Sequence, residues 1–152
     1  MKFCLGSIDF KQGILNSEDI RFFYYEVAQW SELSSLIEYT NTELLNIANE
    51  LNIKLTYINL QDFCDTTISE NEIKFTLRNK NESYQSALLR HLRNSFAHYR
   101  ITYKDLDFYI EDKKYIKSNR YTCIGLINPN KLRNLICDLH EYDEKTRQTN
   151  RC

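Results

Sequence analysis

The sequence predicts a mainly α-helical domain with a small β-hairpin inserted before its last helix. Three observations favour this class. Only three glycines and one proline occur in 152 residues, which leaves few of the turn residues that a many-stranded β sandwich needs. Apolar residues recur at intervals of three and four over long stretches, as on the buried side of a helix. After Tyr99 the apolar and polar residues begin to alternate, which indicates strands.

Length and charge limit the class of protein further. The chain has the size of a single domain, 1–152, and its last residues, about 143–152, are polar and expected to fray. A net charge of −1 lacks the broad positive field of a protein that coats duplex nucleic acid. Any binding of phosphate groups must therefore be local.

Cysteine usage and hydropathy indicate the compartment. The five cysteines are scattered, with no Cys-x-x-Cys pair and no histidine at metal spacing, so we expect reduced thiols and no metal site. The few glycines cannot build a P-loop or a Rossmann turn, and no cofactor is predicted. Neither a signal-peptide core nor a membrane-spanning apolar run is present. We expect a cytoplasmic protein without membrane contact.

The first third of the chain is expected to form two helices. The first begins near residue 18, and its apolar residues over 20–37 keep the spacing of one helix face. The second covers 40–52 with the same spacing. Asn41 or Thr42 breaks or caps the chain between the two.

The middle of the chain is harder to assign. In 55–68 the apolar residues fit neither the helical nor the strand period, so this segment is left open. Ser69 and Glu72 have the spacing of a capping box, which predicts a short helix ending near Leu77. A turn at 79–81 then leads into a further helix.

The last third combines a hairpin with a closing helix. Residues 101–110 alternate as a strand, and 121–127 is its expected partner. The charged segment 111–120 between them is the predicted hairpin loop. Asn128 and Pro129 have the residue types of an N-cap and a first helical position, and an amphipathic helix follows.

The helix LLRHLRNSFAHY, at 88–99, carries the candidate functional residues. One stripe is apolar and predicted to be buried: Leu88, Leu89, Leu92, Phe96 and Tyr99. Across from it lie the polar residues Arg90, His91, Asn94 and His98. Asn94 and His98 are four residues apart and share a face, and the long side chain of Arg93 can reach the same region. These three residues form the predicted polar patch, and His91 is expected to support it or to take no part.

LRNSFAHYRI resembles the motif of the HEPN superfamily, in which an arginine, a polar residue and, a few residues later, a histidine lie on one helix. Arg93, Asn94 and His98 carry the resemblance. The order of elements is also similar to small bacterial HEPN proteins, although similarity in sequence covers only about a dozen residues. The resemblance implies an HEPN-like helical bundle with the hairpin between the motif helix and the C-terminal helix.

The same resemblance implies a metal-independent endoribonuclease, of the kind used as a toxin or antiphage-defence effector, that cleaves RNA as a homodimer. Attack by the RNA 2′-hydroxyl needs a base, an acid and positive charge at the phosphate. One imidazole cannot be both acid and base in one step, so a twofold pair supplies two copies of His98 and Arg93. Asn94 would orient His98 or a phosphate oxygen, and Arg90 and Arg100 would bind phosphates. An antitoxin or defence-system protein is a possible partner.

Two other functions stay open. A catalytically inactive HEPN module would dimerise and bind a nucleotide, an RNA or a partner protein. A helical interaction protein would carry the motif by chance. A second motif is also present, because Arg133 and Asn134 precede His140 on the last helix, but it lacks the small spacer of the first.

Acidic pairs and aromatic residues give weaker signals. The neighbouring acids Glu18 with Asp19, and Glu111 with Asp112, are interpreted as solvated charges. The many aromatic residues around Trp30 indicate core packing or a dimer contact more than base stacking.

Overall fold

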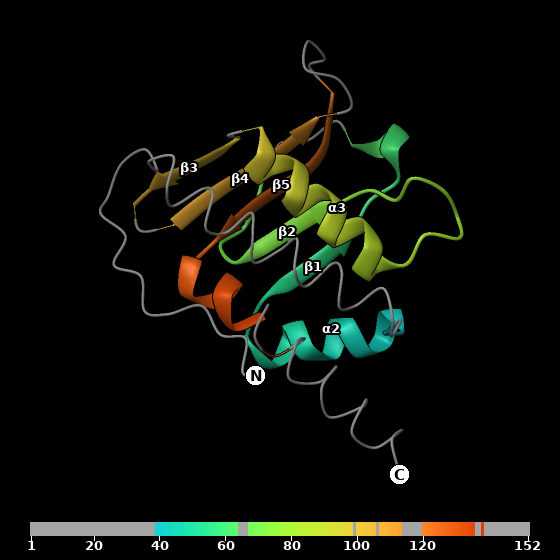
Figure 1. Ribbon diagram of the computed structural model, residues 1–152, viewed down its shortest axis with the longest axis horizontal. Helices are drawn as coiled ribbons and strands as arrows, with labels where there is room; N and C mark the ends of the chain where they lie inside the picture. Colours follow the sequence, from blue (N-terminus) through green and yellow to red (C-terminus); the bar gives the residue numbers. More distant parts are fainter. Residues whose placement is uncertain are drawn as a thin grey trace.

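A computed structural model describes residues 39–63, 67–98, 100–105, 107–113, 120–135 and 138. In this part of the chain a five-stranded mixed sheet has the order β1-β2-β5-β4-β3 (Figure 1). The strands are β1 Lys54–Tyr57, β2 Glu72–Phe75, β3 Ile101–Lys104, β4 Asp107–Lys113 and β5 Tyr121–Ile127. The helices are α2 Asn41–Glu50, the 3-10 turn η1 Leu60–Asp62, α3 Tyr84–Ala97 and a helical segment at 129–135.

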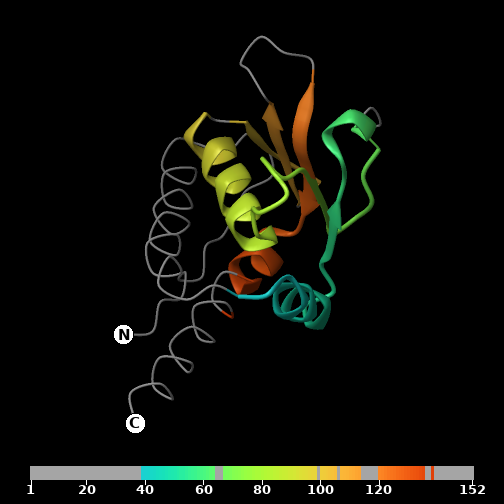
Figure 2. The same ribbon diagram turned by 90° about the vertical axis from the view of Figure 1, so that its right-hand side faces the viewer.

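The fold is α/β, and the prediction of a mainly α, HEPN-like helical bundle with one small hairpin is wrong. The predicted hairpin is only part of a sheet, because β2 adds to β5 and β1 adds to β2. Figure 2 shows α3 on one face of this sheet, with α2 and the helical segment 129–135 near its lower end. The helix predicted over 20–37 and the tail at 143–152 lie outside the described residues.

The centre of the sheet depends on a glycine. β1 and β2 are parallel, whereas the other neighbours are antiparallel, and Gly125 of β5 lies opposite both Ile73 of β2 and Ile110 of β4. A Cβ atom at Gly125 would lie 3.3 Å from Cγ1 of Ile73 and 3.5 Å from Cβ of Ile110. Because both isoleucines are fully buried, the missing side chain allows them to pack over the middle strand.

The capping box predicted at Ser69 and Glu72 leads into a strand, because Glu72 is the first residue of β2, so the predicted helix to Leu77 is wrong. The backbone N–H of Ser69 does donate to the Glu72 carboxylate, at 3.1 Å. The same carboxylate accepts from the Thr56 hydroxyl at 2.8 Å and thereby joins β2 to β1. The spacing that closes a helical turn therefore closes a turn before a strand here.

The predicted helix starts are largely correct. α2 falls within the predicted 40–52, although its N-cap is Thr40, whose hydroxyl accepts from Glu43 N–H at 3.1 Å. At the last helix, the side chain of Asn128 accepts from the N–H of Asn130 at 2.9 Å, as expected of an N-cap before Pro129.

The strand predicted over 101–110 is two strands. β3 and β4 pair through a tight turn at Asp105, whose φ of 53° is left-handed. β4 pairs with β5 as predicted, and it continues to Lys113, three residues into the predicted loop. Cys123 of β5 is a buried free thiol.

The core lies between α3 and the sheet. The Phe96 ring of α3 meets the Phe108 ring of β4 edge-on, with centroids 6.4 Å apart. Leu88 and Leu92, on the same face of α3 as Phe96, are fully buried as predicted. Among the described helices, none has both the length and the apolar character needed to cross a bilayer.

Candidate functional site

The side of α3 that was predicted to be polar is partly buried. His91 was placed across from the apolar stripe, but its side chain is 0% exposed, and Ser95 one turn later is equally buried. α3 therefore has a much wider buried surface than its leucines indicate. The side chains of α3 that are exposed to solvent form only a narrow strip, which includes Arg93 and Ala97.

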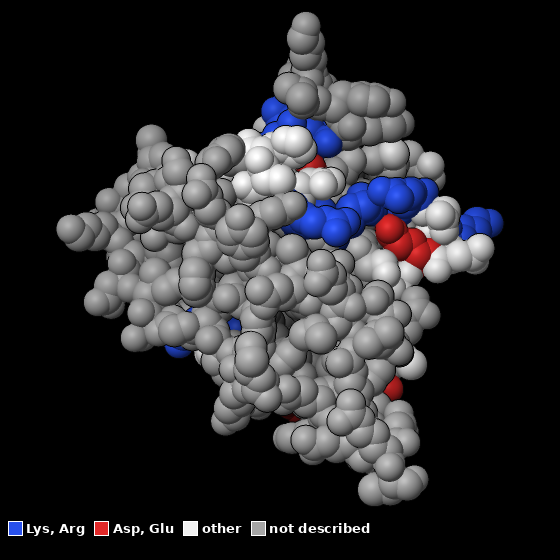
Figure 3. Space-filling model, viewed as in Figure 1, with Lys and Arg blue, Asp and Glu red and all other residues white. Residues whose placement is uncertain are grey.

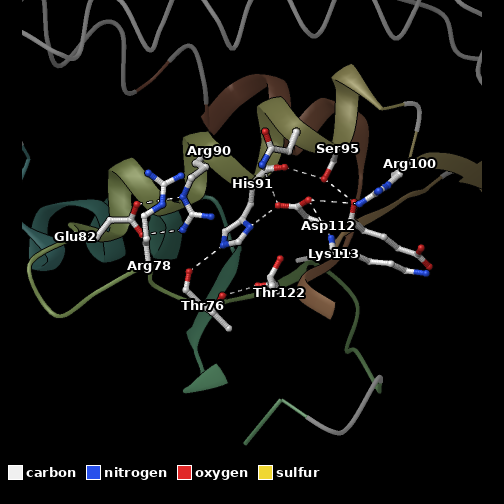
Figure 4. A network of polar contacts seen from close by, with 12 residues as sticks. Thr76, Arg78, Glu82, Arg90, His91, Ser95, Arg100, Asp112, Lys113 and Thr122 are labelled. Carbon is white, nitrogen blue, oxygen red and sulfur yellow. Dashed lines mark hydrogen bonds and ion pairs between the residues drawn. The ribbon is translucent and has the colours of Figure 1, made fainter. Parts of the chain in front are cut away.

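His91 lies between two hydrogen-bond acceptors. Its Nδ1 is 2.8 Å from Oδ2 of Asp112, and its Nε2 is 2.9 Å from the backbone carbonyl of Thr76 (Figure 4). A carbonyl oxygen only accepts, so Nε2 carries a hydrogen. The short contact at Nδ1 then needs one more proton, on the ring or on the carboxylate. His91 and Asp112 together are consequently neutral, and the Asp112 carboxylate adds no net negative charge to its surroundings.

Asp112 is the centre of this network, which the sequence interpretation missed. Glu111 and Asp112 were interpreted as a solvated pair, yet Asp112 is only 3% exposed. Its carboxylate also accepts from the N–H of Lys113 at 3.0 Å, and the Arg100 guanidinium lies 3.7 Å away. The signal was available, because strand alternation continued from Phe108 puts Asp112 on the buried face.

The three predicted catalytic residues are placed differently from one another. Arg93 and His98 are exposed, and neither side chain forms a hydrogen bond or ion pair in the part of the chain that is described. Asn94 is half-buried, and its side-chain amide donates to Oδ2 of Asp112 at 3.4 Å. His98 ends α3, and its backbone N–H donates to the Asn94 carbonyl at 3.0 Å. Asn94 thus connects the exposed end of α3 to the buried network.

Arg90, predicted to bind substrate, has a partner on the loop before α3. Its Nε and Nη2 donate to the two carboxylate oxygens of Glu82, at 3.1 and 2.8 Å. Burial acts to raise the pKa of Glu82, but the hydrogen bonds from Arg90 and from the Arg78 N–H outweigh it and lower that pKa. Glu82 is therefore a carboxylate at neutral pH that neutralises Arg90 and holds the loop against α3.

A cleft of about 350 Å³ opens beside this network. The segment after β2, helix α3 and the facing ends of β4 and β5 contribute most of its walls. Its lining residues are Leu60, Thr76, Leu77, Arg78, Arg90, Asn94, Asp112, Lys113 and Thr122. In Figure 4 Arg78 and Arg90 lie on one side of His91, and Lys113 and Arg100 lie on the other. Figure 3 shows lysine and arginine side chains gathered along this part of the surface.

Two cations of the cleft, Arg78 and Lys113, form no ion pair among the described residues. Arg78 is exposed; its backbone N–H donates to Glu82 at 2.8 Å, and its charge helps to lower the pKa of that carboxylate without forming an ion pair with it. Lys113 is half-buried, with its Nζ 4.9 Å from the centre of the Tyr121 ring. Both charges are available to an anion.

The remaining candidates can be placed in part. Arg133 of the second motif is half-buried on the last helix, whereas His140 lies outside the described residues, as do Glu18, Asp19 and Trp30. The described chain contains no group of three or more His, Cys, Asp or Glu side chains that could hold a metal ion.

Comparisons of the chain with protein-family models, with curated protein sequences and with solved structures find no match. None of these comparisons identifies a HEPN domain in the chain.

Proposed function

We propose that the protein is an endoribonuclease that acts as a homodimer through Arg93 and His98 of each subunit. The observation that carries the proposal is that both side chains are exposed near the end of α3 and have no partner in the described chain. Both side chains are therefore accessible to a substrate, and a guanidinium is suited to bind a phosphate. The α/β fold differs from the helical bundle that the resemblance implies, so only these residues and their surroundings support a nuclease.

The proposed reaction needs no group beyond these side chains. Neutral His98 of one subunit takes the proton of the RNA 2′-hydroxyl, and the 2′-oxygen attacks phosphorus. The bond from phosphorus to the 5′-oxygen breaks, and that oxygen takes a proton from the protonated His98 of the partner subunit. Arg93 stabilises the charge on the phosphorane through its planar guanidinium. The products are a 2′,3′-cyclic phosphate and a 5′-hydroxyl.

The neighbouring residues have supporting roles in this proposal. Asn94 is bound to Asp112 and positions the turn that ends in His98. Arg100, 3.7 Å from Asp112, lies just beyond α3 and binds a phosphate of the same RNA. Arg90 keeps one nitrogen, Nη1, outside its two bonds to Glu82 and can contribute it to a phosphate.

The proposed setting is the cytoplasm, where an RNase of this kind serves as a toxin or an antiphage effector. The cell that makes such an enzyme must inhibit its RNase activity, so an antitoxin or another defence-system protein is the proposed partner.

The test is cleavage of a labelled single-stranded RNA by purified protein in EDTA. We expect products with 2′,3′-cyclic phosphate ends, and a loss of at least about 100-fold in rate in Arg93→Ala and in His98→Ala. His140→Ala, which alters the second motif, is the matched control and should keep the wild-type rate. Cleavage that survives in His98→Ala and disappears in His140→Ala would overturn the assignment.

A second candidate is a module that binds RNA without cleaving it. The cleft with Arg78 and Lys113 favours it, because an anion can bind there without help from His98. RNA binding by wild-type protein without cleavage products would support this candidate and reject the nuclease.

A further inference from the structure

The charges around the cleft do not cancel. Asp112 lines it, but this carboxylate and His91 are neutral together, as their contacts require. Glu82 is paired with Arg90 through two hydrogen bonds. The positive charges of Arg78 and Lys113 are the two lining charges that no ion pair balances. The cleft therefore has a net charge of about +2, although the whole chain has a net charge of −1.

Size and lining suggest the ligand. About 350 Å³ is at the lower end of small-molecule sites and suits a single nucleotide unit. Two cations, two threonine side chains and one amide offer polar contacts, and Leu60 and Leu77 add apolar surface for a base or sugar. A cleft of this kind fits a phosphate attached to an organic group better than a free inorganic anion.

The cleft is in line with the proposed catalytic end of α3. Arg90, Asn94 and His98 follow each other at intervals of four, so they form one row along the helix. The first two line the cleft, and His98 lies one turn further, about 6 Å along the axis from Asn94. A strand that enters the cleft can therefore continue toward His98.

We propose that this cleft binds one nucleotide of single-stranded RNA, next to the nucleotide that is cleaved, with Arg78 on one side and Lys113 on the other contacting the two phosphates that flank it. The inference rests on the proposed function for the identity of the strand. The binding itself needs neither Arg93 nor His98.

The test is binding of a fluorescent 2′-O-methyl RNA dodecamer, which has no free 2′-hydroxyl for attack, measured by anisotropy at several salt concentrations. Arg78→Ala/Lys113→Ala should weaken binding at least tenfold and lower the slope of log K against log salt by roughly 0.7 per cation removed. Lys54→Ala/Lys131→Ala is the matched control, because it removes the same charge near the opposite end of the sheet. It should leave both affinity and slope close to those of the wild type.

The outcomes separate this inference from the proposed function. If the cleft variant binds like the control variant, the cleft is not the RNA site, even where His98→Ala abolishes cleavage. If the cleft variant loses binding and the wild type cleaves no RNA, the cleft inference stands and the nuclease fails. Circular dichroism and thermal unfolding confirm that each variant is folded, which the exposure of Arg78 and the half-exposure of Lys113 lead us to expect.

Discussion

The imidazole of His91 and the carboxylate of Asp112 meet 2.8 Å apart in the interior and join α3 to β4. Both side chains are almost completely removed from solvent. Removing one partner leaves the other buried without its main contact, which is far more damaging than losing an exposed pair.

His91→Ala should therefore lower the free energy of unfolding by about 3–5 kcal/mol, measured by urea denaturation at neutral pH. Arg93→Ala changes an exposed residue of the same helix and should stay within about 0.5 kcal/mol of the wild type. A His91→Leu/Asp112→Leu variant, which removes both polar groups, should recover part of the loss. A value for His91→Ala within about 1 kcal/mol of the wild type would show that the pair has no structural importance.

The Glu82 carboxylate gives a pH-dependent contribution. Its pKa in the folded protein is below the ordinary value of 4.5, so the unfolded chain binds the proton more tightly. The stabilisation is complete above about pH 4.5 and is lost as the pH falls through the lower folded pKa. Glu82→Gln should lower the unfolding free energy by about 1–2 kcal/mol at pH 7, and the difference from the wild type should shrink below pH 4.5.

The matched control for this measurement is Glu50→Gln, which changes an exposed carboxylate at the end of α2. Its unfolding free energy at pH 7 should be near that of the wild type. A Glu82→Gln difference that stays constant from pH 7 to acid would contradict the assigned role of the carboxylate.

Replacing Gly125 by a residue with a larger side chain should destabilise the protein. Gly125→Val should destabilise the protein by about 1–3 kcal/mol, because its side chain would press on Ile73 and Ile110 in the middle of the sheet. The specific contact is tested with a double-mutant cycle of Gly125→Ala and Ile73→Ala. If the 3.3 Å approach to Ile73 limits the site, Gly125→Ala should be better tolerated when Ile73 is already alanine. If the losses in unfolding free energy of the two single variants add up in the double variant, contact with Ile73 is not what restricts the side chain at position 125.

If the active site is shared by two subunits, a wild-type subunit that pairs with an inactive subunit should lose its activity. A tenfold molar excess of His98→Ala protein, allowed to exchange with wild-type subunits, should lower the rate of RNA cleavage by about tenfold, because most wild-type chains then have an inactive partner. The same excess of albumin serves as the control for dilution and RNA capture. A rate that follows the wild-type concentration alone would indicate a site complete within one chain.

Local patterns predicted several elements but not the fold class. α2, α3, the start of the last helix and the pairing of β4 with β5 follow from apolar spacing and capping residues close together in the sequence. β1 and β2 did not follow, since each has only four residues and is defined by partners elsewhere in the chain. Ser69 and Glu72 were misleading because a serine and a glutamate three apart can close either a helical turn or a turn before a strand.

Sequence spacing could place only the exposed residues of the candidate site. His98 was placed on the polar side of the helix and Arg93 was expected to reach the same region, and both residues are exposed in the structure. His91 was misjudged because the sheet residue that balances its polarity, Asp112, is 21 positions away. Arg78 and Lys113 could not be linked to α3 from spacing, because the sheet brings them to one cleft.

The junction after α3 has a consequence for ligand binding. Ser95 Oγ lies 2.8 Å from the Glu111 carbonyl, the Arg100 N–H donates to the Ser95 carbonyl at 2.9 Å, and the Glu111 N–H donates to the Arg100 carbonyl at 3.1 Å. These three hydrogen bonds connect the end of α3 to β4. The backbone after α3 is thus already fixed before a ligand binds. Binding therefore costs little conformational entropy of the protein.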